Sequence, residues 1–327
     1  MTDYLVALRT HIRRSVADAM PSATSVFIGG GTPTLVPARE LMGVLAEIPL
    51  AIGAEVTVEC NPDDITLEMM QTFRAGGVNR ISIGVQSTVD HVLKSLGRTH
   101  DPENVRRSVA CVCEAGFKTF NLDIIYGAAG ETLDDWSRTL NDVVALDPPH
   151  VSAYGLTVEA NTVLATQPDR HPDDDDQADK YLLCDDVLSG RGLQNYEISN
   201  WAKLGHECEH NSLYWLQGNY EGFGSAAHAH LNGRRWWNVR TPDRYIELVM
   251  AGESPESSSE TLDEQTSKRE MLQLLVRTRD GVPLGSFSNA DLDEMSELLE
   301  QQSDRIVLTR AGRLLANEVA LRLIDTV

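Results

Sequence analysis

Short apolar segments alternate with longer amphipathic segments from residue 25 to about residue 157. The short segments are rich in Val, Ile and Phe, and their length favours strands; they are residues 25–28, 55–59, 80–85, 119–125 and 151–156. The longer segments are predicted helices, at residues 39–47, 67–74, 102–115 and 132–146. Such alternation predicts a parallel sheet whose strands are joined by right-handed helical crossovers.

Polar side chains stand at or near the end of each predicted strand, namely Thr32, Glu59, Gln86, Asp123 and Thr157. The carboxyl ends of parallel strands converge on one rim of the sheet, where ligands bind in α/β proteins. A single polar residue at a strand end is most often a solvated or capping residue. Its recurrence at five successive strands predicts a ligand site at this rim.

The predicted sheet is too small to close into a barrel, because closed barrels begin at about eight strands. A helix-prone segment, residues 4–15, precedes the first predicted strand, so it resembles a crossover whose own leading strand is missing. The pattern alone therefore predicts an α/β fold class in which either the parallel sheet stays open or strands are missing.

The pattern changes after residue 157. An acidic run at 172–176 is expected to be a loop or a helix start, and a helix is expected at 179–188. Residues 196–237 are dense in aromatic residues, His and Gly, which suggests a loop-rich segment that lines a ligand site. Residues 254–260 are predicted to form a polar linker. We expect three parts: a parallel α/β part (1–165), an extension (166–245) and a C-terminal module (246–327).

The C-terminal module is predicted to be helical and winged-helix-like. Helices are expected at 270–277 and 291–302, a strand at 306–308, and a helix at 311–324 capped by Thr309. Modules of this kind often bind DNA, but residues 291–302 contain five acidic residues and neither Lys nor Arg. Packing or a protein partner is the better expectation.

The charge balance narrows the function further. The chain has 28 Lys and Arg against 49 Asp and Glu, a formal net charge of −21, which repels phosphate backbones and disfavours a nucleic-acid binder. No apolar run approaches the ~20 residues that span a bilayer. Five scattered cysteines exclude a disulfide scaffold and fit a reducing cytoplasm.

Three consecutive glycines follow the first predicted strand, and bare backbone N–H groups there would let a polar ligand approach closely. On composition alone, a tight strand–helix turn is an equally good explanation. This segment, IGGGTP at 28–33, is the first of five motifs that resemble the coproporphyrinogen-dehydrogenase-like branch of the radical S-adenosylmethionine (SAM) enzymes. The other four are ECNP at 59–62, NRISIGVQS at 79–87, LGRTH at 96–100 and NLDIIYG at 121–127.

Three later motifs resemble the haem-chaperone subgroup of that branch, the HemW type: YEISN at 196–200, HNSLYW at 210–215 and GFGSAAH at 222–228. The resemblance implies that residues 1–165 form a partial parallel (β/α) barrel of the radical SAM type, whose first strand is missing. It also implies haem as cargo, and haem-acceptor proteins, among them membrane-bound respiratory proteins, as partners.

The resemblance also places SAM on the predicted rim. The backbone of Gly30, Gly31 and Thr32 would hold its amino end, and Glu59 would accept hydrogen bonds from its ribose. Arg98 would pair with its carboxylate. Gln86 and Asp123 would complete the polar rim, and Thr157 falls where the family has a variable contact.

One feature of the radical SAM pattern is missing from this chain. The family holds a [4Fe–4S] cluster on three cysteines spaced Cys-x3-Cys-x2-Cys, and cluster iron takes thiolate ligands. No such spacing occurs here, and Cys111 and Cys113 would face nearly opposite ways on a helix. We expect the cysteine loop and the leading strand to be encoded upstream of Met1, so that the cluster forms only in an N-terminally extended form. The alternative is a natural cluster-less relative.

A second candidate site lies in the His-rich and aromatic stretch. His206, Cys208 and His210 alternate, but their spacing matches no standard zinc site. Haem is a flat apolar disc that requires aromatic neighbours and an axial His, Cys, Met or Tyr. The candidate haem residues are His210, Tyr214, Trp215 and His228; a motif that only packs the C-terminal module is the alternative.

The sequence thus predicts a cytoplasmic haem chaperone of the radical SAM superfamily that binds haem and passes it to acceptor proteins. The cofactors implied are SAM and, in the extended form, a [4Fe–4S] cluster. One alternative is an oxygen-independent coproporphyrinogen III dehydrogenase, and a second is a cluster-less ligand-binding protein. No catalytic residue can be named, and whether the chain is an enzyme stays open.

Overall fold

The computed structural model describes residues 1–98, 100–160 and 162–323. It contains a seven-stranded sheet with the order β1-β2-β3-β4-β5-β7-β6. The strands are β1 (Ala23–Ile28), β2 (Leu50–Cys60), β3 (Arg80–Gln86), β4 (Thr119–Tyr126), β5 (His150–Gly155), β6 (Gln194–Glu197) and β7 (Asn200–Ala202). β2 to β5 pair in parallel, whereas β7 pairs antiparallel to both β5 and β6. The five predicted strands and the partial parallel barrel are confirmed.

The chain divides into two compact units, and the strands β1 and β2 belong partly to each. One unit comprises residues 27–35 and 56–207, and the other comprises residues 1–26, 36–55 and 208–327. We call them the barrel unit and the composite unit. The three-part division expected from sequence motifs stays a prediction.

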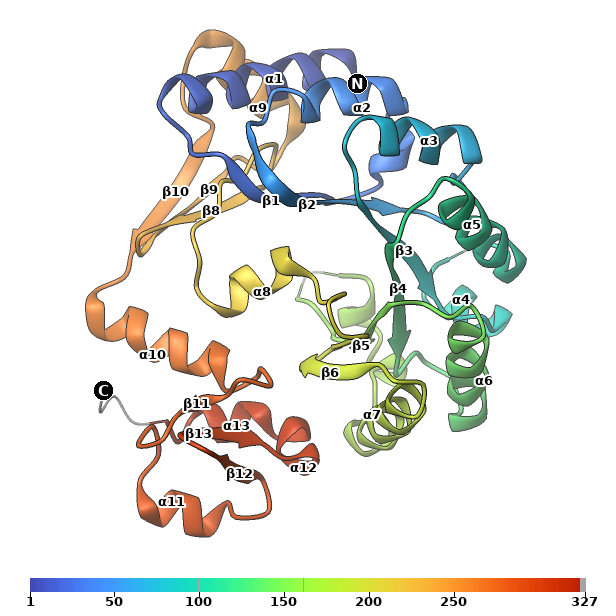
Figure 1. Ribbon diagram of the computed structural model, residues 1–327, viewed down its shortest axis with the longest axis vertical. Helices are drawn as coiled ribbons and strands as arrows, with labels where there is room; N and C mark the ends of the chain where they lie inside the picture. Colours follow the sequence, from blue (N-terminus) through green and yellow to red (C-terminus); the bar gives the residue numbers. More distant parts are fainter. Residues whose placement is uncertain (99, 161, 324–327) are drawn as a thin grey trace. The chain divides into compact units, whose positions relative to one another are not determined.

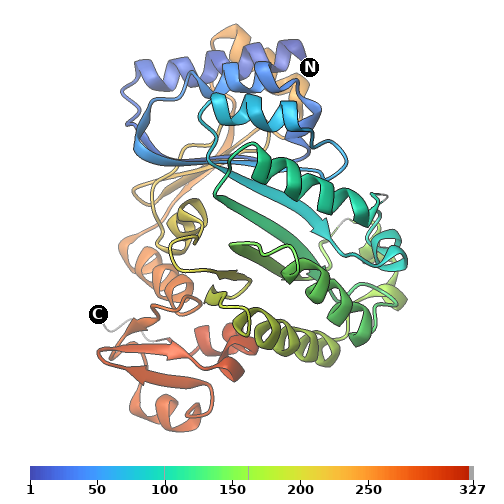
Figure 2. The ribbon, with the colours of Figure 1, turned by 45° about the vertical axis from the view of Figure 1, so that its right-hand side comes forward.

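The barrel unit contains the parallel strands and the helices that cover them. These helices are α3 (Leu67–Ala75), α4 (Asp90–Ser95), α5 (Pro102–Glu114), α6 (Leu133–Val144) and α7 (Asp174–Ser189), with short 3-10 turns at Pro33–Leu35, Leu164–Thr166 and Pro168–Arg170. α3, α5 and α6 line one side of the parallel strands (Figure 1 and Figure 2). The strands read as near-continuous apolar runs, and Val58, Ile81, Ile83, Leu122 and Val151 are fully buried, as expected for a parallel sheet covered by helices.

Helix ends in this unit follow the signals in the sequence. Asp101 caps α5 with its side chain, Pro102 occupies the first turn, and Gly116 follows the helix with φ of 87°. Asp173 caps α7, so the acidic run is the start of this helix. Carboxylates there lie next to the positive end of the helix dipole. α7 is consequently longer than the predicted segment 179–188.

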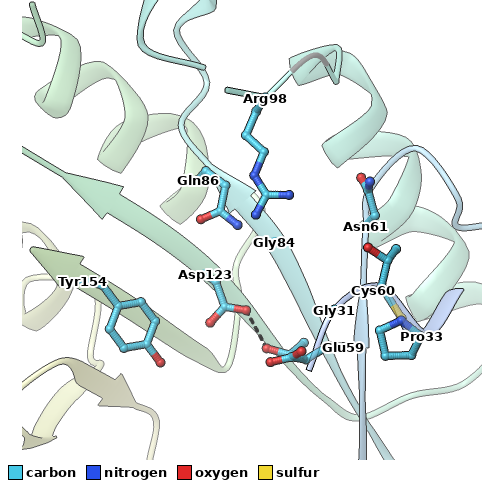
Figure 3. A pocket seen from close by; sticks show the side chains of 12 residues that line it. Gly31, Pro33, Glu59, Cys60, Asn61, Gly84, Gln86, Arg98, Asp123 and Tyr154 are labelled. Carbon is cyan, nitrogen blue, oxygen red and sulfur yellow. Dashed lines mark hydrogen bonds between the residues drawn. The ribbon is translucent and has the colours of Figure 1, made fainter. Parts of the chain in front are cut away.

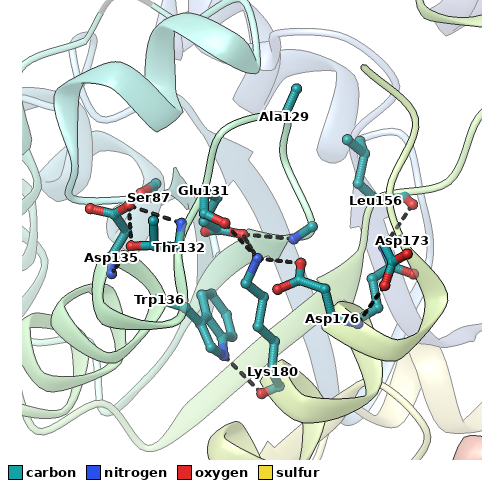
Figure 4. Close-up of polar contacts among 12 residues, drawn as sticks. Ser87, Ala129, Glu131, Thr132, Asp135, Trp136, Leu156, Asp173, Asp176 and Lys180 are labelled. Carbon is teal, nitrogen blue, oxygen red and sulfur yellow. Dashed lines mark hydrogen bonds and ion pairs between the residues drawn. The ribbon is translucent and has the colours of Figure 1, made fainter. Parts of the chain in front are cut away.

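A buried lysine joins α7 to the loop that follows β4 (Figure 4). Lys180 Nζ donates to Asp176 Oδ2 at 2.6 Å and to the Glu131 carbonyl oxygen at 2.9 Å, and it lies 3.3 Å from Glu131 Oε2. Gly127 N donates to the carboxylate oxygen Oε2 of Glu131 at 2.7 Å. A buried ammonium is tolerated only when it is paired in this way, and its contacts hold the loop after β4 in place.

The composite unit contains three groups of elements. α1 (Thr2–Ala17), α2 (Ala38–Leu45) and α9 (Pro242–Ala251) pack together through Leu5, Ile12, Val44, Tyr245 and Val249. A three-stranded sheet has the order β10-β9-β8, from β8 (His228–Leu231), β9 (Arg234–Asn238) and β10 (Glu256–Thr261). The short helix α8 (Glu209–Trp215) precedes this sheet.

The third group is the C-terminal module. It consists of α10 (Glu264–Leu275), β11 (Val282–Pro283), α11 (Asn289–Glu294), β12 (Leu299–Gln302), β13 (Arg305–Leu308), α12 (Arg310–Leu314) and α13 (Ala316–Ala320). Its strands form an antiparallel sheet with the order β11-β13-β12. Its core includes Leu272, Val276, Phe287, Ile306 and Val319.

Three sequence-based element assignments are wrong. The predicted linker 254–260 contains most of β10, which pairs with β9. The predicted helix 291–302 stops at Glu294, because residues 299–302 pair with β13 across a turn in which Ser303 has φ of 55°. The predicted helix 311–324 breaks at Leu315, whose ψ is 25°; residue 324 lies outside the described part of the chain.

Within the described residues, no helix combines the length and the apolar character needed to cross a bilayer.

Candidate functional site

The barrel unit contains a cavity of about 350 Å³ at the carboxyl ends of β2, β3 and β4 (Figure 3). Six residues predicted for the rim line it: Gly31, Thr32, Glu59, Gln86, Arg98 and Asp123. Six further residues that the sequence reasoning did not assign to the ligand also line it: Pro33, Cys60, Asn61, Ser82, Gly84 and Tyr154. We call this cavity the rim pocket.

Two predicted rim residues lie outside the lining. The backbone N–H of Gly30 donates to Glu59 Oε2 at 3.3 Å, so Gly30 adjoins the pocket through that carboxylate. The Thr157 hydroxyl donates to the Gly155 carbonyl oxygen at 3.3 Å. On β5 it is Tyr154, three residues earlier, whose ring faces the pocket (Figure 3).

The glycine segment at 29–31 takes a backbone path that favours glycine, by its dihedral angles at two positions and by a close approach at the third. Gly30 and Gly31 have φ of 80° and 133°, in the region that favours glycine. A Cβ on Gly29 would lie 2.6 Å from Glu59 Oε2. The segment therefore passes close to the Glu59 carboxylate because it lacks side chains.

The end of β3 is irregular, and this irregularity places Gln86. The β3–β4 register shifts between Gly84 and Gln86, and Gln86 has φ of 62°, which is rare for a residue with a side chain. The Gln86 amide lies over Gly84, where a Cβ would be 2.9 Å from Gln86 Nε2. The bulge thus aims an amide into the rim pocket.

Asp123 is the most extensively hydrogen-bonded carboxylate of the pocket. Ser82 Oγ donates to Asp123 Oδ2 at 2.7 Å, and Asn121 Nδ2 donates to Asp123 Oδ1 at 2.7 Å. Burial raises the pKa of Asp123, and these hydrogen bonds oppose that rise. Burial, and to a smaller extent the negative charge of Asp123, raises the pKa of Glu59. The hydrogen bond from the Gly30 N–H opposes this rise.

Among the described residues that line it, the pocket therefore combines acceptors with one cation. Glu59 and Asp123 supply carboxylates, Gln86 and Asn61 supply amides, and the exposed Arg98 extends its guanidinium toward the pocket (Figure 3). Such a set suits a polar ligand that has both hydrogen-bond donors and a carboxylate.

Part of the missed lining could have been found by strand periodicity. Ser82, Gly84 and Gln86 alternate along β3 and lie on one face of a strand, so the prediction of Gln86 implied the other two. Tyr154 gave no comparable signal, because a tyrosine in a strand is usually read as a packing residue.

The cysteines do not assemble a cluster site. Cys60, Cys184 and Cys208 are buried, and burial raises the pKa of the Cys60 and Cys184 thiols, which disfavours the thiolate that iron needs. No three His, Cys, Asp or Glu side chains are grouped to hold a metal ion anywhere in the described ranges. A [4Fe–4S] cluster does not fit the cysteines present.

The haem candidates all belong to the composite unit. His210 Nδ1 lies 2.9 Å from Ser25 Oγ, and His210 Nε2 lies 3.0 Å from the Tyr214 hydroxyl. The Tyr214 ring packs edge-on against Tyr220. His228 instead stacks on Trp237, with ring centroids 5.8 Å apart.

α8, which contains three of these candidates, is capped by a carboxylate from β2. Glu55 accepts from Glu209 N at 3.1 Å, from His210 N at 3.0 Å and from Cys208 Sγ at 3.4 Å. Trp215 is half-buried, and its indole Nε1 has no hydrogen-bond partner in the described structure. His206, the first member of the alternating His and Cys residues, bonds Thr119 in the barrel unit instead.

Comparison with known proteins gives a consistent result. The model of the radical SAM superfamily matches residues 11–143. The chain is 38% identical to "Heme chaperone HemW" of Mycobacterium tuberculosis, over 98% of this chain and 86% of that protein. It is 32% identical to the protein of that name from Bacillus subtilis, over 97% of this chain and 90% of that one.

A solved structure matches the fold. Coproporphyrinogen III oxidase (HemN) from Escherichia coli, described as a radical SAM enzyme, superposes with a TM-score of 0.84 over 99% of this chain and 82% of the other. The two sequences are 22% identical, so this likeness shows the fold alone. From the sequence identities, the chain belongs to the HemW family of the radical SAM superfamily.

Proposed function

We propose that this protein is a haem chaperone that binds haem and passes it to acceptor proteins, with SAM held in the rim pocket. The observation that carries the proposal is the identity of 38% across 98% of the chain to a protein named as a haem chaperone. All five cysteines are free, which supports action in a reducing compartment such as the cytoplasm.

The charges of the rim pocket support SAM as its ligand. SAM has two cationic groups, an ammonium and a sulfonium, together with a carboxylate and a ribose diol. The part of the lining that the structure describes has two carboxylates, Glu59 and Asp123, and one guanidinium, Arg98, so its charges complement those of the ligand. In the radical SAM superfamily, bound SAM is the source of an adenosyl radical.

Each predicted contact has a group suited to it. Glu59 can accept from the ribose hydroxyls, Arg98 can pair with the ligand carboxylate, and Gln86 offers both a donor and an acceptor. The backbone passes Glu59 at Gly30, Gly31 and Thr32, and its polar groups there can hold the amino end of SAM. Asp123 can accept from a hydroxyl or an ammonium.

The composite unit supplies residues of the kind that haem iron accepts. His210 and Tyr214 present an imidazole and a phenol whose polar atoms are 3.0 Å apart, both on α8 and both partly exposed. Trp215 follows them on the same helix, and His228 lies on β8. We propose these four as the haem-contacting residues.

Titration of haem into the purified protein, read by the Soret band, tests the cargo. We expect uptake near one haem per chain, weakened in His210→Ala and unchanged in the control His91→Ala, which replaces an exposed histidine of the barrel unit. Haem-loaded protein should then transfer haem to membranes from haem-deficient cells. Absence of stoichiometric uptake contradicts the proposal.

A separate assay can overturn the chaperone proposal in favour of an oxidase. The protein should release no carbon dioxide from coproporphyrinogen III in the presence of SAM and a reductant. Sustained turnover would replace the chaperone with a dehydrogenase.

A further inference from the structure

A chain of buried polar side chains leads from the interior of the barrel unit to Asp123. The Tyr196 hydroxyl lies 2.9 Å from His150 Nε2, and His150 Nδ1 lies 2.7 Å from Asn121 Oδ1. Asn121 Nδ2 lies 2.7 Å from Asp123 Oδ1. Tyr196, His150 and Asn121 are at most 5% exposed. Asp123 is the member of this chain that lines the rim pocket.

The Asp123 carboxylate, in its ionised form, fixes the direction of every hydrogen bond in the series from Tyr196 to Asp123. An ionised carboxylate only accepts, so the Asn121 amide must turn its NH₂ group toward Asp123 and its oxygen toward His150. An amide oxygen also only accepts, so His150 must have its proton on Nδ1. His150 Nε2 is then an acceptor, and the Tyr196 hydroxyl must donate to it. All three bonds point toward Asp123.

Further contacts agree with this direction. Ser82 Oγ donates to the other oxygen of Asp123 and can accept from Asn121 Nδ2 at 2.8 Å. Burial, followed by the nearby Arg80, holds the pKa of His150 well below its usual range, so the ring is neutral and can have a single tautomer. Aligned donors of this kind stabilise a negative charge at the end of the chain.

We propose that Tyr196 and His150 are positioning residues of the rim pocket: through Asn121 they hold the Asp123 carboxylate as a hydrogen-bond acceptor for the bound nucleoside. This inference rests on the proposed function for the identity of the ligand. It specifies that the ligand group opposite Asp123 is a donor, such as a ribose hydroxyl or the ammonium. Neither Tyr196 nor His150 is among the residues that line the pocket.

The first test needs no ligand and no variant. Nitrogen-15 NMR of the histidine rings distinguishes a protonated from an unprotonated ring nitrogen. We expect His150 to be neutral, with the proton on Nδ1, from pH 6 to pH 8. A proton on Nε2, or a charged ring, would overturn the proposed direction of the chain.

The second test removes one hydroxyl. Tyr196→Phe leaves His150 Nε2 without a donor, which weakens the polarisation of the chain and raises the pKa of Asp123. We expect SAM binding, measured by calorimetry, to weaken by about three- to tenfold at pH 6 and by less at pH 8. The titratable groups that interact electrostatically with Asp123 include Glu59 on β2, Arg80 on β3 and Tyr154 on β5, and they are unchanged in this variant.

Tyr181→Phe is the matched control, because it also removes a buried tyrosine hydroxyl, from a ring that packs on Trp201 in the same unit. Equal affinities in the two variants at both pH values would reject the positioning role. If the wild-type protein does not bind SAM at all, the ligand assignment fails, whereas the His150 tautomer still decides whether the hydrogen-bond chain exists.

Discussion

At residue 29 the backbone passes so close to the Glu59 carboxylate that a methyl group cannot be inserted without displacing it. Gly29→Ala should therefore push the Glu59 side chain out of the rim pocket, and SAM binding should weaken roughly ten- to hundredfold, because charge-assisted hydrogen bonds are lost. Calorimetric titration with SAM measures the effect.

Gly43→Ala is the control for this substitution. It adds a methyl group within α2, where the nearest atom would be 3.8 Å from the new Cβ, and alanine is favoured over glycine inside a helix. Affinity in Gly29→Ala equal to that in Gly43→Ala would show that the close approach to Glu59 is unimportant for the ligand.

Residue identity predicted much of the rim pocket, because polar groups at the ends of parallel strands converge wherever the sheet forms. Glu59, Gln86 and Asp123 were found in this way. The φ of 62° at Gln86 could not be foreseen, since it follows from a register shift between two strands. Tyr154 replaces Thr157 for a similar reason, because the exact end of a strand depends on its partners.

At the scale of elements, α8 depends on a cap that lies more than 150 positions earlier in the sequence. Glu55 on β2 accepts from two backbone N–H groups at the start of this helix. Glu55→Ala should loosen α8 by about 1–3 kcal/mol, because these partly buried N–H groups lose their acceptor. Hydrogen exchange should accelerate in residues 209–216 and stay unchanged in α7.

The control for α8 is Glu209→Ala, which removes an exposed carboxylate from the first turn of the same helix. If both variants accelerate exchange equally, the general charge near the helix start is responsible, and the specific cap from Glu55 is not.

The packing of α1 against α9 should depend on pH through His11. Its Nδ1 lies 2.9 Å from the Tyr245 hydroxyl, and burial, followed by Arg14, lowers the pKa of His11 from 6.5 to about 4. Between pH 6.5 and about pH 4, His11 is therefore protonated in the unfolded chain but neutral in the folded chain. This contribution is complete above pH 6.5 and is lost as the pH falls toward 4, by about 3 kcal/mol in all.

Urea unfolding at pH 7.5 and pH 5 measures this contribution. The wild-type protein should lose more stability between these pH values than His11→Asn does, and the exposed His171→Asn should behave like the wild type. An unchanged pH dependence in His11→Asn would show that His11 is not the group responsible.

Element assignments from sequence failed where tertiary pairing overrode local preference. Residues 299–302, LEQQ, have good helix propensity, yet they form β12 because a turn at Ser303 returns the chain along β13. Residues 256–261, ESSSET, resemble a linker, yet they form an edge strand against β9. No local pattern could reveal these partners.

At the scale of the whole molecule, the two proposed ligands fall in different compact units. Every residue assigned to SAM lies in the barrel unit, and His210, Tyr214, Trp215 and His228 all lie in the composite unit. Each set is held by hydrogen bonds within its own unit, such as Ser82 to Asp123 in one and Ser25 to His210 in the other. The two binding activities should therefore be separable by mutation.

A two-by-two experiment tests this separation. Arg98→Ala should weaken SAM binding roughly ten- to hundredfold, because a charge-assisted pair is lost, and should leave haem uptake unchanged. His210→Ala should weaken haem uptake and leave SAM affinity unchanged. Arg138→Ala, which removes an exposed arginine from α6, is the control for the lost positive charge. A loss of SAM affinity in His210→Ala as large as that in Arg98→Ala would contradict the proposal that the two binding activities are separable.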